Sequence, residues 1–256
     1  VLGAAESGVG AALLAQKKGI QVFVSDGGKI KDAFKAILVE NQIEFEEGGH
    51  SEERILSATE LIKSPGIPEK ASIIKKARAS NIPVISEIEF ASRYTKAKII
   101  AITGSNGKTT TTLLTYHIFK KAGLNVILAG NVGDSLAKML ATAPSDPDYI
   151  VLEVSSFQLD DIQYFKPHIS ILLNITPDHL DRYEYKFENY IRSKFNVTKN
   201  QDEHDYFIYN ADDSVIAQFI SEQRIDAQKI PFSIESEQLN GAYVEHQNQR
   251  GFEMAP

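Results

Sequence analysis

The sequence of 256 residues is long enough for two domains of ordinary size, each with its own hydrophobic core. Its 43% hydrophobic and 24% charged residues are typical of a soluble globular protein, and no apolar run approaches the roughly 20 residues of a membrane span. A net charge of −7 argues against a nucleic-acid-binding surface, and the absence of cysteine excludes disulfides and thiolate metal sites. We therefore expect a cytoplasmic protein that binds neither nucleic acid nor membranes.

Apolar strands alternate with amphipathic helices along the first part of the chain. Strands are predicted at residues 1–2, 21–26, near 45, 61–63 and 83–85, and helices through 13–17, over about 29–40 and around 88–91. This alternation is typical of a largely parallel sheet covered by helices. The stretch from Arg93 to Lys98 is short and polar, and we place the domain boundary there. The prediction is a first domain of residues 1–93 and a second of residues 94–256.

A glycine-rich turn opens the first domain. It runs from Gly3 to Gly10 between a strand and a helix, and Asp26 closes the next strand. This resembles a dinucleotide-binding unit, but Ala5 replaces the second glycine of G-x-G-x-x-G, which lets a pyrophosphate approach the backbone. Three interpretations stay open: an NAD site, a site for the diphosphate of another nucleotide, and a tight turn without a ligand. A phosphate-bearing ligand other than NAD fits best.

The second domain continues the same alternation. Strands are predicted at residues 98–102, 126–128, 149–153, 169–173 and 206–209, helices at 108–121, 134–141, 186–199 and 213–223, and a hairpin at 241–252. The pattern predicts a second α/β sheet. Val1 has the character of a mid-strand residue without a secretion signal, and Pro256 ends no predicted element. We therefore expect a fragment of a longer chain.

A phosphate loop opens the second domain, where residues 103–112 read Thr-Gly-Ser-Asn-Gly-Lys-Thr-Thr-Thr-Thr between a strand and a helix. Gly104 and Gly107 let the backbone curl so that N–H groups point inward, and the following helix adds the positive end of its dipole. Lys108 is expected to reach the β- and γ-phosphates of a nucleoside triphosphate, and the Thr109 hydroxyl to bind Mg²⁺. The order of strand, loop, Lys-Thr and helix favours this site over a simple turn with a solvated lysine.

Acidic and imidazole groups follow two other strands of the second domain. Glu153 ends the strand at 149–153, and His179 follows the strand at 169–173. Open α/β sheets bind ligands at the carboxyl ends of their strands, where a carboxylate beside a phosphate loop can hold Mg²⁺. We predict a joint metal role, against a solvated strand end for Glu153 and a capping or core position for His179. From pattern alone, Lys194 is a lysine on the solvated face of a helix.

Five motifs together resemble the Mur ligases of bacterial cell-wall synthesis. In chain order they are TGSNGKTTT (103–111), GNVG (130–133), LEVSSFQL (152–159), NITPDHLDR (174–182) and NADD (210–213). Within the family, the SSFQL run and SPGIP at 64–68 look most like the ligase that adds D-glutamate to UDP-N-acetylmuramoyl-L-alanine. The resemblance covers nearly all of the chain.

The resemblance implies three domains. This chain would hold the Rossmann-like, UDP-substrate-binding first domain and most of the phosphate-loop NTPase-like, ATP-binding central domain, while the Rossmann-like third domain is absent. The implied activity is ATP-dependent amide-bond formation through an acyl phosphate, with Mg²⁺, in peptidoglycan precursor synthesis. We expect a monomer, and expect this chain alone to be inactive. A sibling Mur ligase, folylpolyglutamate synthase and a non-catalytic nucleotide-binding fragment stay open as alternatives.

The resemblance also implies roles for individual residues. Those at the ATP are Gly104, Asn106, Gly107, Lys108, Thr109 and Thr110 around the phosphates and Asn210 at the adenine. Those at the substrate are Ser7 near the UDP diphosphate, Asp26 at the uracil, and Asn131 and Ser155 along the substrate and phosphate path. The implied catalytic residues are Lys108, Glu153, His179 and Lys194, and the implied Mg²⁺ ligands are Thr109, Glu153, His179 and Lys194 as a carbamate. The chain departs from the family pattern at Glu6, acidic within the diphosphate turn, and at Gly27-Gly28, where hydrogen-bonding side chains are expected.

Overall fold

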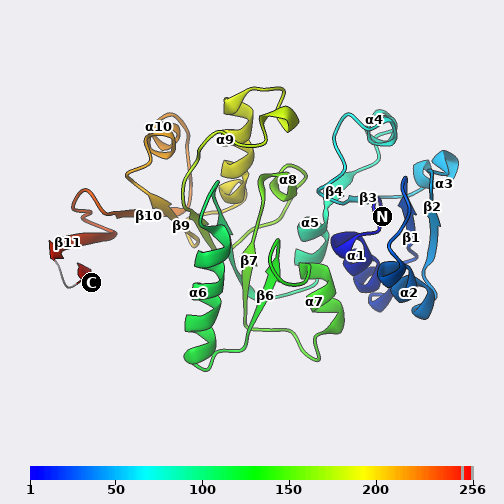
Figure 1. Ribbon diagram of the computed structural model, residues 1–256, viewed down its shortest axis with the longest axis horizontal. Helices are drawn as coiled ribbons and strands as arrows, with labels where there is room; N and C mark the ends of the chain where they lie inside the picture. Colours follow the sequence, from blue (N-terminus) through cyan, green and yellow to red (C-terminus); the bar gives the residue numbers. More distant parts are fainter. Residues whose placement is uncertain (249–250, 255–256) are drawn as a thin grey trace.

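The computed structural model describes the backbone of residues 1–248 and 251–254 (Figure 1). The first domain contains β1 (Phe23–Asp26), β2 (Glu44–Glu47), β3 (Leu61–Lys63) and β4 (Val84–Ser86), with α1 (Glu6–Lys17), α2 (Asp32–Glu40), α3 (Glu52–Leu56), α4 (Ser72–Ala79) and α5 (Glu87–Ser92). Strands β1 and β2 pair in parallel, as do β3 and β4. Leu2 joins the two pairs, because it bridges Ser25 on one side and Lys63 on the other. The expected parallel, helix-covered arrangement is confirmed.

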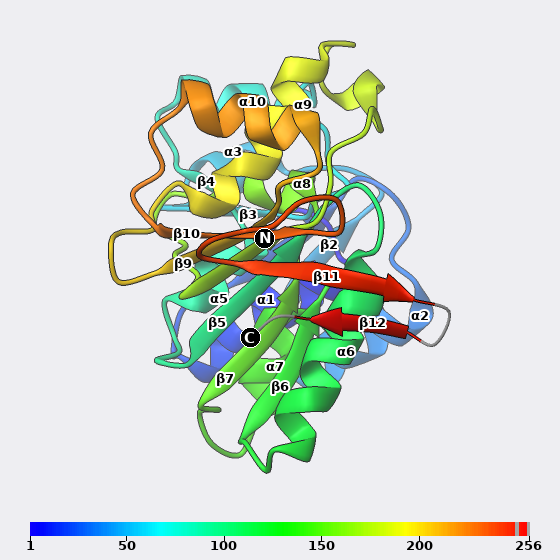
Figure 2. The same cartoon turned by 90° about the vertical axis from the view of Figure 1, so that its left-hand side faces the viewer.

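The second domain is built on one eight-stranded sheet. Its elements are β5 (Lys98–Thr103), α6 (Lys108–Lys121), β6 (Val126–Gly130), α7 (Leu136–Thr142), β7 (Tyr149–Glu153), α8 (Ser156–Leu159), β8 (Ile169–Leu172), the 3₁₀ turn η1 (Leu180–Arg182), α9 (Phe187–Phe195), the 3₁₀ turn η2 (Asn196–Thr198), β9 (Tyr206–Asn210), α10 (Ser214–Glu222), β10 (Gln228–Ser233), β11 (Ala242–Asn248) and β12 (Gly251–Met254). The strand order is β12-β11-β10-β9-β8-β5-β7-β6. The pairs are parallel except for the β11–β12 hairpin, which Figure 2 shows in red at the front.

The phosphate-loop strand β5 lies inside this sheet, between β7 and β8. Every residue of β5 after Lys98 is buried, as expected for a parallel strand with both faces covered. The carboxyl ends of β5, β7 and β8 therefore meet at one edge of the sheet, where the loops after Thr103, Glu153 and Leu172 begin.

One buried apolar cluster contains residues of both domains. Helices α1 and α5 of the first domain pack against α7 of the second (Figure 1). Leu14 and Ile88 belong to the same buried cluster as Leu136 and Leu152. Lys17 Nζ also donates to carbonyls at the end of α7, including that of Ala141 at 2.8 Å. The positions of the two domains are thus set by packing as well as by the short connection at residues 93–97.

Most predicted elements are confirmed, with differences at their ends. The helix predicted from about residue 29 begins at Asp32, since Lys31 has the extended backbone of an N-cap. The helix predicted over 186–199 ends as an α-helix at Phe195 and continues as a 3₁₀ turn. Strand β10 was not predicted, because Pro231 and polar residues obscure its pattern. The two strands of the predicted hairpin, β11 and β12, pair in antiparallel fashion, and residues 249–250 between them lie outside the described residues.

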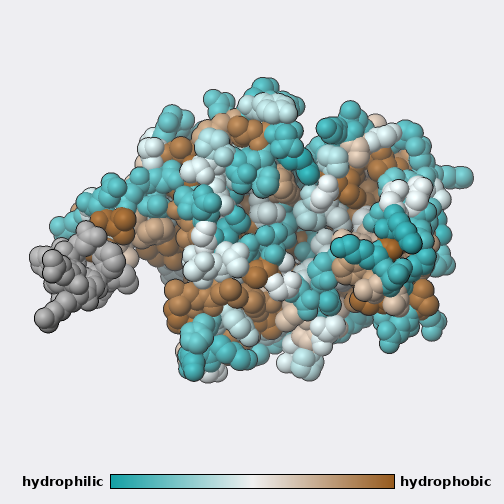
Figure 3. All heavy atoms as spheres, in the orientation of Figure 1, coloured by the Kyte–Doolittle hydropathy of each residue, from teal (hydrophilic) through white to brown (hydrophobic). Residues whose placement is uncertain are grey.

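One face of α6 is apolar and exposed. Leu113, Leu114 and Ile118 are exposed large hydrophobic residues, and Figure 3 shows the apolar patch over this helix. The described residues leave this face of α6 uncovered. Among those same residues, none of the helices has the length and apolar character required to cross a bilayer.

Candidate active site

The phosphate loop has the predicted form of strand, turn and helix. Gly104 and Gly107 have positive φ angles of 154° and 80°, and α6 begins at the next residue, Lys108. A Cβ at Gly104 would lie only 3.0 Å from Leu173 Cβ. A side chain at this position would therefore press against Leu173, which directly follows β8. Asn174 holds the loop, because its Oδ1 accepts from Asn106 N at 2.8 Å. The turn is therefore conformationally specified by its glycines.

Lys108 lies over this loop. Its Nζ donates to the carbonyl oxygens of Gly104 and Ser105, both at 2.9 Å. The neighbouring Thr109 and Thr110 are exposed in the first turn of α6. An ammonium and free hydroxyls at the N-terminus of a 14-residue helix make a site suited to anionic phosphate groups.

Lys194 is buried, so the interpretation from pattern alone was wrong. Its side chain is 1% exposed, its Nζ donates to Gly104 O at 2.8 Å, and the Nζ lies 4.7 Å from the centre of the Tyr190 ring. Within the described part of the chain it forms no ion pair with a carboxylate. Burial, together with the charge of Lys108, lowers the pKa of Lys194 to about 7. The helix thus delivers a readily deprotonated amine to the phosphate loop.

Glu153 is also buried, which excludes the solvated strand end. It is 1% exposed at the end of β7, and its Oε1 accepts from Asn131 Nδ2 at 2.9 Å. Its Oε2 has no hydrogen-bond partner among the described residues. A buried carboxylate oxygen without a donor is costly, and a cation is the partner that satisfies it best. This oxygen is the observation that fits a divalent metal ion.

His179 lies at the edge of the site. Its side chain is 57% exposed, its Nε2 is 3.5 Å from Asp178 Oδ2, and its ring centre is 5.3 Å from that of Phe157. Over the residues that the structure describes, no three His, Cys, Asp or Glu side chains are grouped as a metal site. A metal role for His179 therefore stays a prediction. Such a metal ion would need ligands beyond a group of these four side-chain types.

A cavity of about 270 Å³ brings several predicted residues together. Residues of the second domain form most of the wall, and one loop of the first domain closes it. The lining residues are Pro65, Gly66, Lys108, Asn131, Ser155, Ser156, Phe157, Asp178, His179, Arg182, Tyr190 and Lys194. Glu153 lies behind Asn131, to which it is bonded. Sequence reasoning missed Arg182 and Tyr190, although both belong to motifs or helices that it had singled out.

Ser155 and Asn210 take positions at strand ends. The backbone N and the Oγ of Ser155 both donate to Gln158 Oε1, at 2.9 and 3.0 Å, at the start of α8. Asn210 ends β9, and its Oδ1 accepts from Asp212 N at 3.0 Å. Asn210 does not line the cavity that contains Lys108, so its contact with adenine stays a prediction.

A larger cavity of about 790 Å³ lies in the first domain, beside Phe23, Leu61 and Phe90. None of the predicted site residues lines it. The smaller cavity is the candidate site, because it contains the cationic and amide side chains that can act on phosphates.

In the first-domain turn, Ser7 Oγ donates to Ser64 Oγ at 3.4 Å. Asp26 supports this turn, because its Oδ2 accepts from Ala4 N at 2.7 Å and its Oδ1 from Gly28 N at 2.8 Å. Each carboxylate oxygen thus retains acceptor capacity for a ligand. The contacts of Ser7 and Asp26 with a uridine nucleotide stay predictions.

Two departures from the family pattern have structural explanations. Glu6 pairs with Lys138 of α7, at 3.2 Å between Oε1 and Nζ. Its charge is therefore neutralised at the domain interface. At Gly27, a Cβ would lie 3.1 Å from His50 Nε2, so the imidazole occupies the space beside the backbone. His50 Nδ1 is in turn 2.6 Å from Ser25 Oγ.

Comparison with known proteins identifies the family. The Mur ligase middle domain model matches residues 102–255, and the MurD N-terminal domain model matches residues 3–73. Proteins named UDP-N-acetylmuramoylalanine--D-glutamate ligase are similar to this chain: that of Christiangramia forsetii is 54% identical over 97% of the chain, and one from Bacteroides fragilis is 56% identical over 96%. The chain spans 55% of the length of each of these relatives.

Solved structures show the same fold. A UDP-N-acetylmuramate:L-alanyl-gamma-D-glutamyl-meso-diaminopimelate ligase from Neisseria meningitides aligns with a TM-score of 0.66 and 16% identity, over 99% of this chain and 82% of that one. The UDP-N-acetylmuramate-alanine ligase of Thermotoga maritima aligns with a TM-score of 0.55 and 20% identity, over 96% and 54%. At such identities the likeness concerns the fold alone. Since the middle-domain model alone matches more than half of the sequence, this chain belongs to the Mur ligase family.

Proposed function

We propose that the full-length protein is an ATP-dependent ligase that adds D-glutamate to UDP-N-acetylmuramoyl-L-alanine in peptidoglycan precursor synthesis. The observation that carries this proposal is the buried pair of groups beside the phosphate loop. Lys194 Nζ contacts the loop carbonyl of Gly104, and the unpaired oxygen of Glu153 belongs to the strand next to β5. The relatives that are more than half identical carry the name of this ligase, which supports the choice of substrate.

The chemistry follows from the low reactivity of a carboxylate. An oxygen of the L-alanyl carboxylate attacks the γ-phosphorus of ATP, the bond to the bridging oxygen breaks, and ADP leaves with the bonding electrons. The amine nitrogen of D-glutamate then attacks the acyl carbon and loses a proton, and inorganic phosphate leaves. Lys108 and the loop N–H groups hold the phosphates in line, so positioning and charge neutralisation supply most of the catalysis.

The residues present fit Mg²⁺. Glu153 Oε2, Thr109 and His179 would hold it, together with Lys194 as a carbamate. When bound, Mg²⁺ supplies charge neutralisation at the transferred phosphoryl group.

Carbamylation of Lys194 requires a neutral amine. The amine nitrogen forms a bond to the carbon of CO₂ and loses a proton, which replaces a cation by an anionic group with oxygen ligands. Lys194 suits this reaction, because its burial without a carboxylate partner favours the neutral form near pH 7. An intact-mass measurement under CO₂ would detect the modification.

We also infer that the first domain binds the uridine nucleotide rather than NAD. Ala5 stands where G-x-G-x-x-G has the glycine that lets a pyrophosphate approach, while the Ser7 hydroxyl and the Asp26 carboxylate retain acceptor capacity beside the hydrogen bonds that they form. The monomeric state and the cytoplasmic location stay predictions from the sequence. This chain alone is expected to be inactive, because it spans about half of the relatives' length.

The test is phosphate release by the full-length protein with Mg-ATP, UDP-N-acetylmuramoyl-L-alanine and one amino acid at a time. We expect turnover with D-glutamate and none with L-glutamate, L-alanine or diaminopimelate. Turnover with another amino acid would indicate a sibling ligase. Turnover with a folate and L-glutamate would indicate folylpolyglutamate synthase. ATP binding without any turnover would indicate a non-catalytic module.

A further inference from the structure

One loop of the first domain forms part of the wall of the second-domain cavity. Residues 64–68 follow β3, and Pro65 and Gly66 of this loop line the same cavity as Lys108 and Lys194. The loop ends at residue 68, well before the second domain begins at residue 94. Its position at the cavity therefore depends on contacts between the domains.

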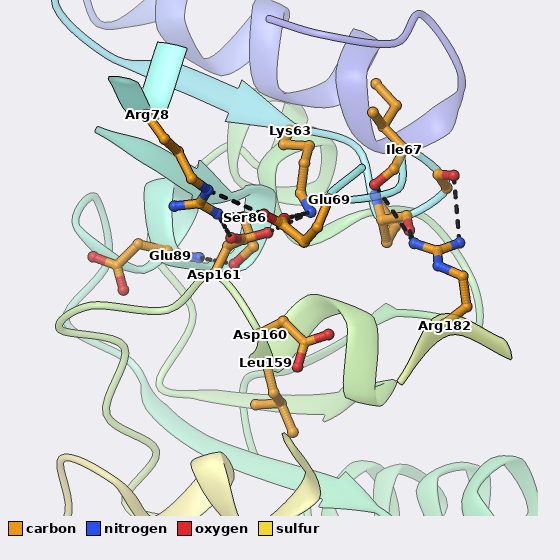
Figure 4. Close-up of polar contacts among 12 residues, drawn as sticks. Lys63, Ile67, Glu69, Arg78, Ser86, Glu89, Leu159, Asp160, Asp161 and Arg182 are labelled. Carbon is orange, nitrogen blue, oxygen red and sulfur yellow. Dashed lines mark hydrogen bonds and ion pairs between the residues drawn. The ribbon is translucent and has the colours of Figure 1, made fainter. Parts of the chain in front are cut away.

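Arg182 makes one of these contacts. Its guanidinium donates to Pro65 O at 3.1 Å and reaches Gly66 O and Ile67 O at 3.5 Å each, as Figure 4 shows. The same group lies 4.5 Å from the centre of the Phe157 ring, which orients it. A planar fork over three successive carbonyls is a contact that a lysine cannot reproduce.

Asp161 makes the second contact, at the root of the loop. Its Oδ2 pairs with Lys63 Nζ at 2.8 Å and its Oδ1 with Arg78 Nη2 at 2.7 Å, so one carboxylate from the second domain binds two cations of the first (Figure 4). The side chains of Lys63 and Asp161 are each only 4% exposed. Asp161 O also accepts from Ser86 N at 3.0 Å. A charge pair as deeply buried as that of Lys63 and Asp161 is weakly screened by salt and holds a defined geometry.

The neighbouring Asp160 extends the connection to the catalytic elements. Its Oδ1 accepts from Ser193 Oγ at 2.5 Å and its Oδ2 from Tyr183 OH at 3.0 Å. Ser193 precedes Lys194 on α9, and Tyr183 follows Arg182. Two adjacent carboxylates thus face opposite ways, one toward the first domain and the other toward the helix that carries Lys194.

We propose that Asp161 and Arg182 are positioning residues that clamp the loop at residues 64–68 as a wall of the cavity, so that substrate held by the first domain is presented to the phosphate loop. Neither residue needs to touch the reacting atoms. Misplacement of a positioning element by about 1 Å can cost up to a hundredfold in rate, which is enough for such a clamp to matter. The effect on turnover rests on the proposed function, whereas the effect on the loop does not.

The test compares full-length wild type with Asp161→Asn and Arg182→Lys. We expect the KM for UDP-N-acetylmuramoyl-L-alanine to rise about tenfold in each, while the Kd for Mg-ATP changes less than about twofold, because the phosphate loop is not touched. Hydrogen exchange of peptides covering residues 61–71 is expected to become faster in both variants without any substrate. Asp161→Glu keeps the charge and is expected to restore part of the KM.

Glu52→Gln is the matched control, since it removes an exposed ion pair with Lys76 that lies within the first domain. It is expected to match wild type in both measurements. If Asp161→Asn does not fold, the double variant Lys63→Met, Asp161→Leu replaces the buried pair by apolar side chains and serves for the same measurements. A folded variant with wild-type KM and wild-type exchange at residues 61–71 would overturn the proposal. Absence of D-glutamate ligation in wild type would instead contradict the proposed function, and the exchange data would still decide the clamp.

Discussion

Removing the buried amine at Lys194 is expected to stabilise the fold while it abolishes the proposed activity. Burial lowers the pKa of Lys194 from 10.5 to about 7. Between these two pH values, the Lys194 amine is mostly neutral in the folded state and mostly protonated in the unfolded chain. Between these two pH values the unfolded chain binds more protons, and the stability of wild type therefore rises with pH. At about 1.4 kcal/mol per pKa unit, the unmodified lysine costs the fold roughly 4 kcal/mol at pH 7 and about 1 kcal/mol at pH 10.

The assay is urea unfolding of wild type and Lys194→Met at pH 7 and pH 10 in CO₂-free buffer. The variant is expected to exceed wild type in unfolding free energy at pH 7 and to lose most of this advantage at pH 10, a change of about 3–4 kcal/mol in the difference. Arg192→Met, an exposed cation on the same helix, controls for loss of charge alone. An equal pH dependence for wild type and Lys194→Met would refute the reasoning.

Four further predictions concern single residues. Lys108→Ala should abolish Mg-ATP binding without unfolding, because its ammonium serves only the loop; unchanged affinity in calorimetry would remove the phosphate-loop assignment. Asp26→Ala should weaken UDP binding by about 1–3 kcal/mol, measured by titration against NAD as the non-binding control. Lys194→Ala in the full-length enzyme should lose turnover, and added acetate should restore part of it by supplying anionic oxygens; full activity without acetate would exclude a catalytic role. Burial raises the pKa of Glu87 from 4.5 to about 7, so its contribution to stability is present below pH 4.5 and is lost as the pH rises through 7. In melting temperatures measured over this pH range, Glu87→Gln should therefore show a weaker pH dependence than wild type. An unaltered pH dependence in the variant would contradict this assignment.

Secondary structure was predictable where local chemistry decides it. The helix at residues 108–121 and the strand at 149–153 have the predicted bounds. In the first case Gly107 takes a left-handed conformation directly before the helix, and Gly123 takes another after it. Strand β10 escaped prediction, because a proline in a sheet is tolerated only in particular positions that the neighbouring strands determine.

The candidate site was predictable only in part. The glycines, lysine and threonines of the phosphate loop are close together in the chain, so their spacing alone predicts a phosphate-binding loop. The solvent exposure of Glu153 and Lys194 is different, because it depends on what packs over them. Pattern placed Lys194 on a solvated face, whereas the structure buries it against Gly104, 90 residues earlier.

The sequence by itself determined the alternation of strands and helices, the phosphate loop and the family, because each depends on residues close together in the chain. Tertiary structure alone decided that Glu6 pairs with α7, that one oxygen of Glu153 lacks a donor among the described residues, and that Asp161 joins the two domains. Burial, charge pairing and pKa depend on neighbours brought together from distant segments. Such neighbours are a property of the packed molecule, and no local pattern encodes them.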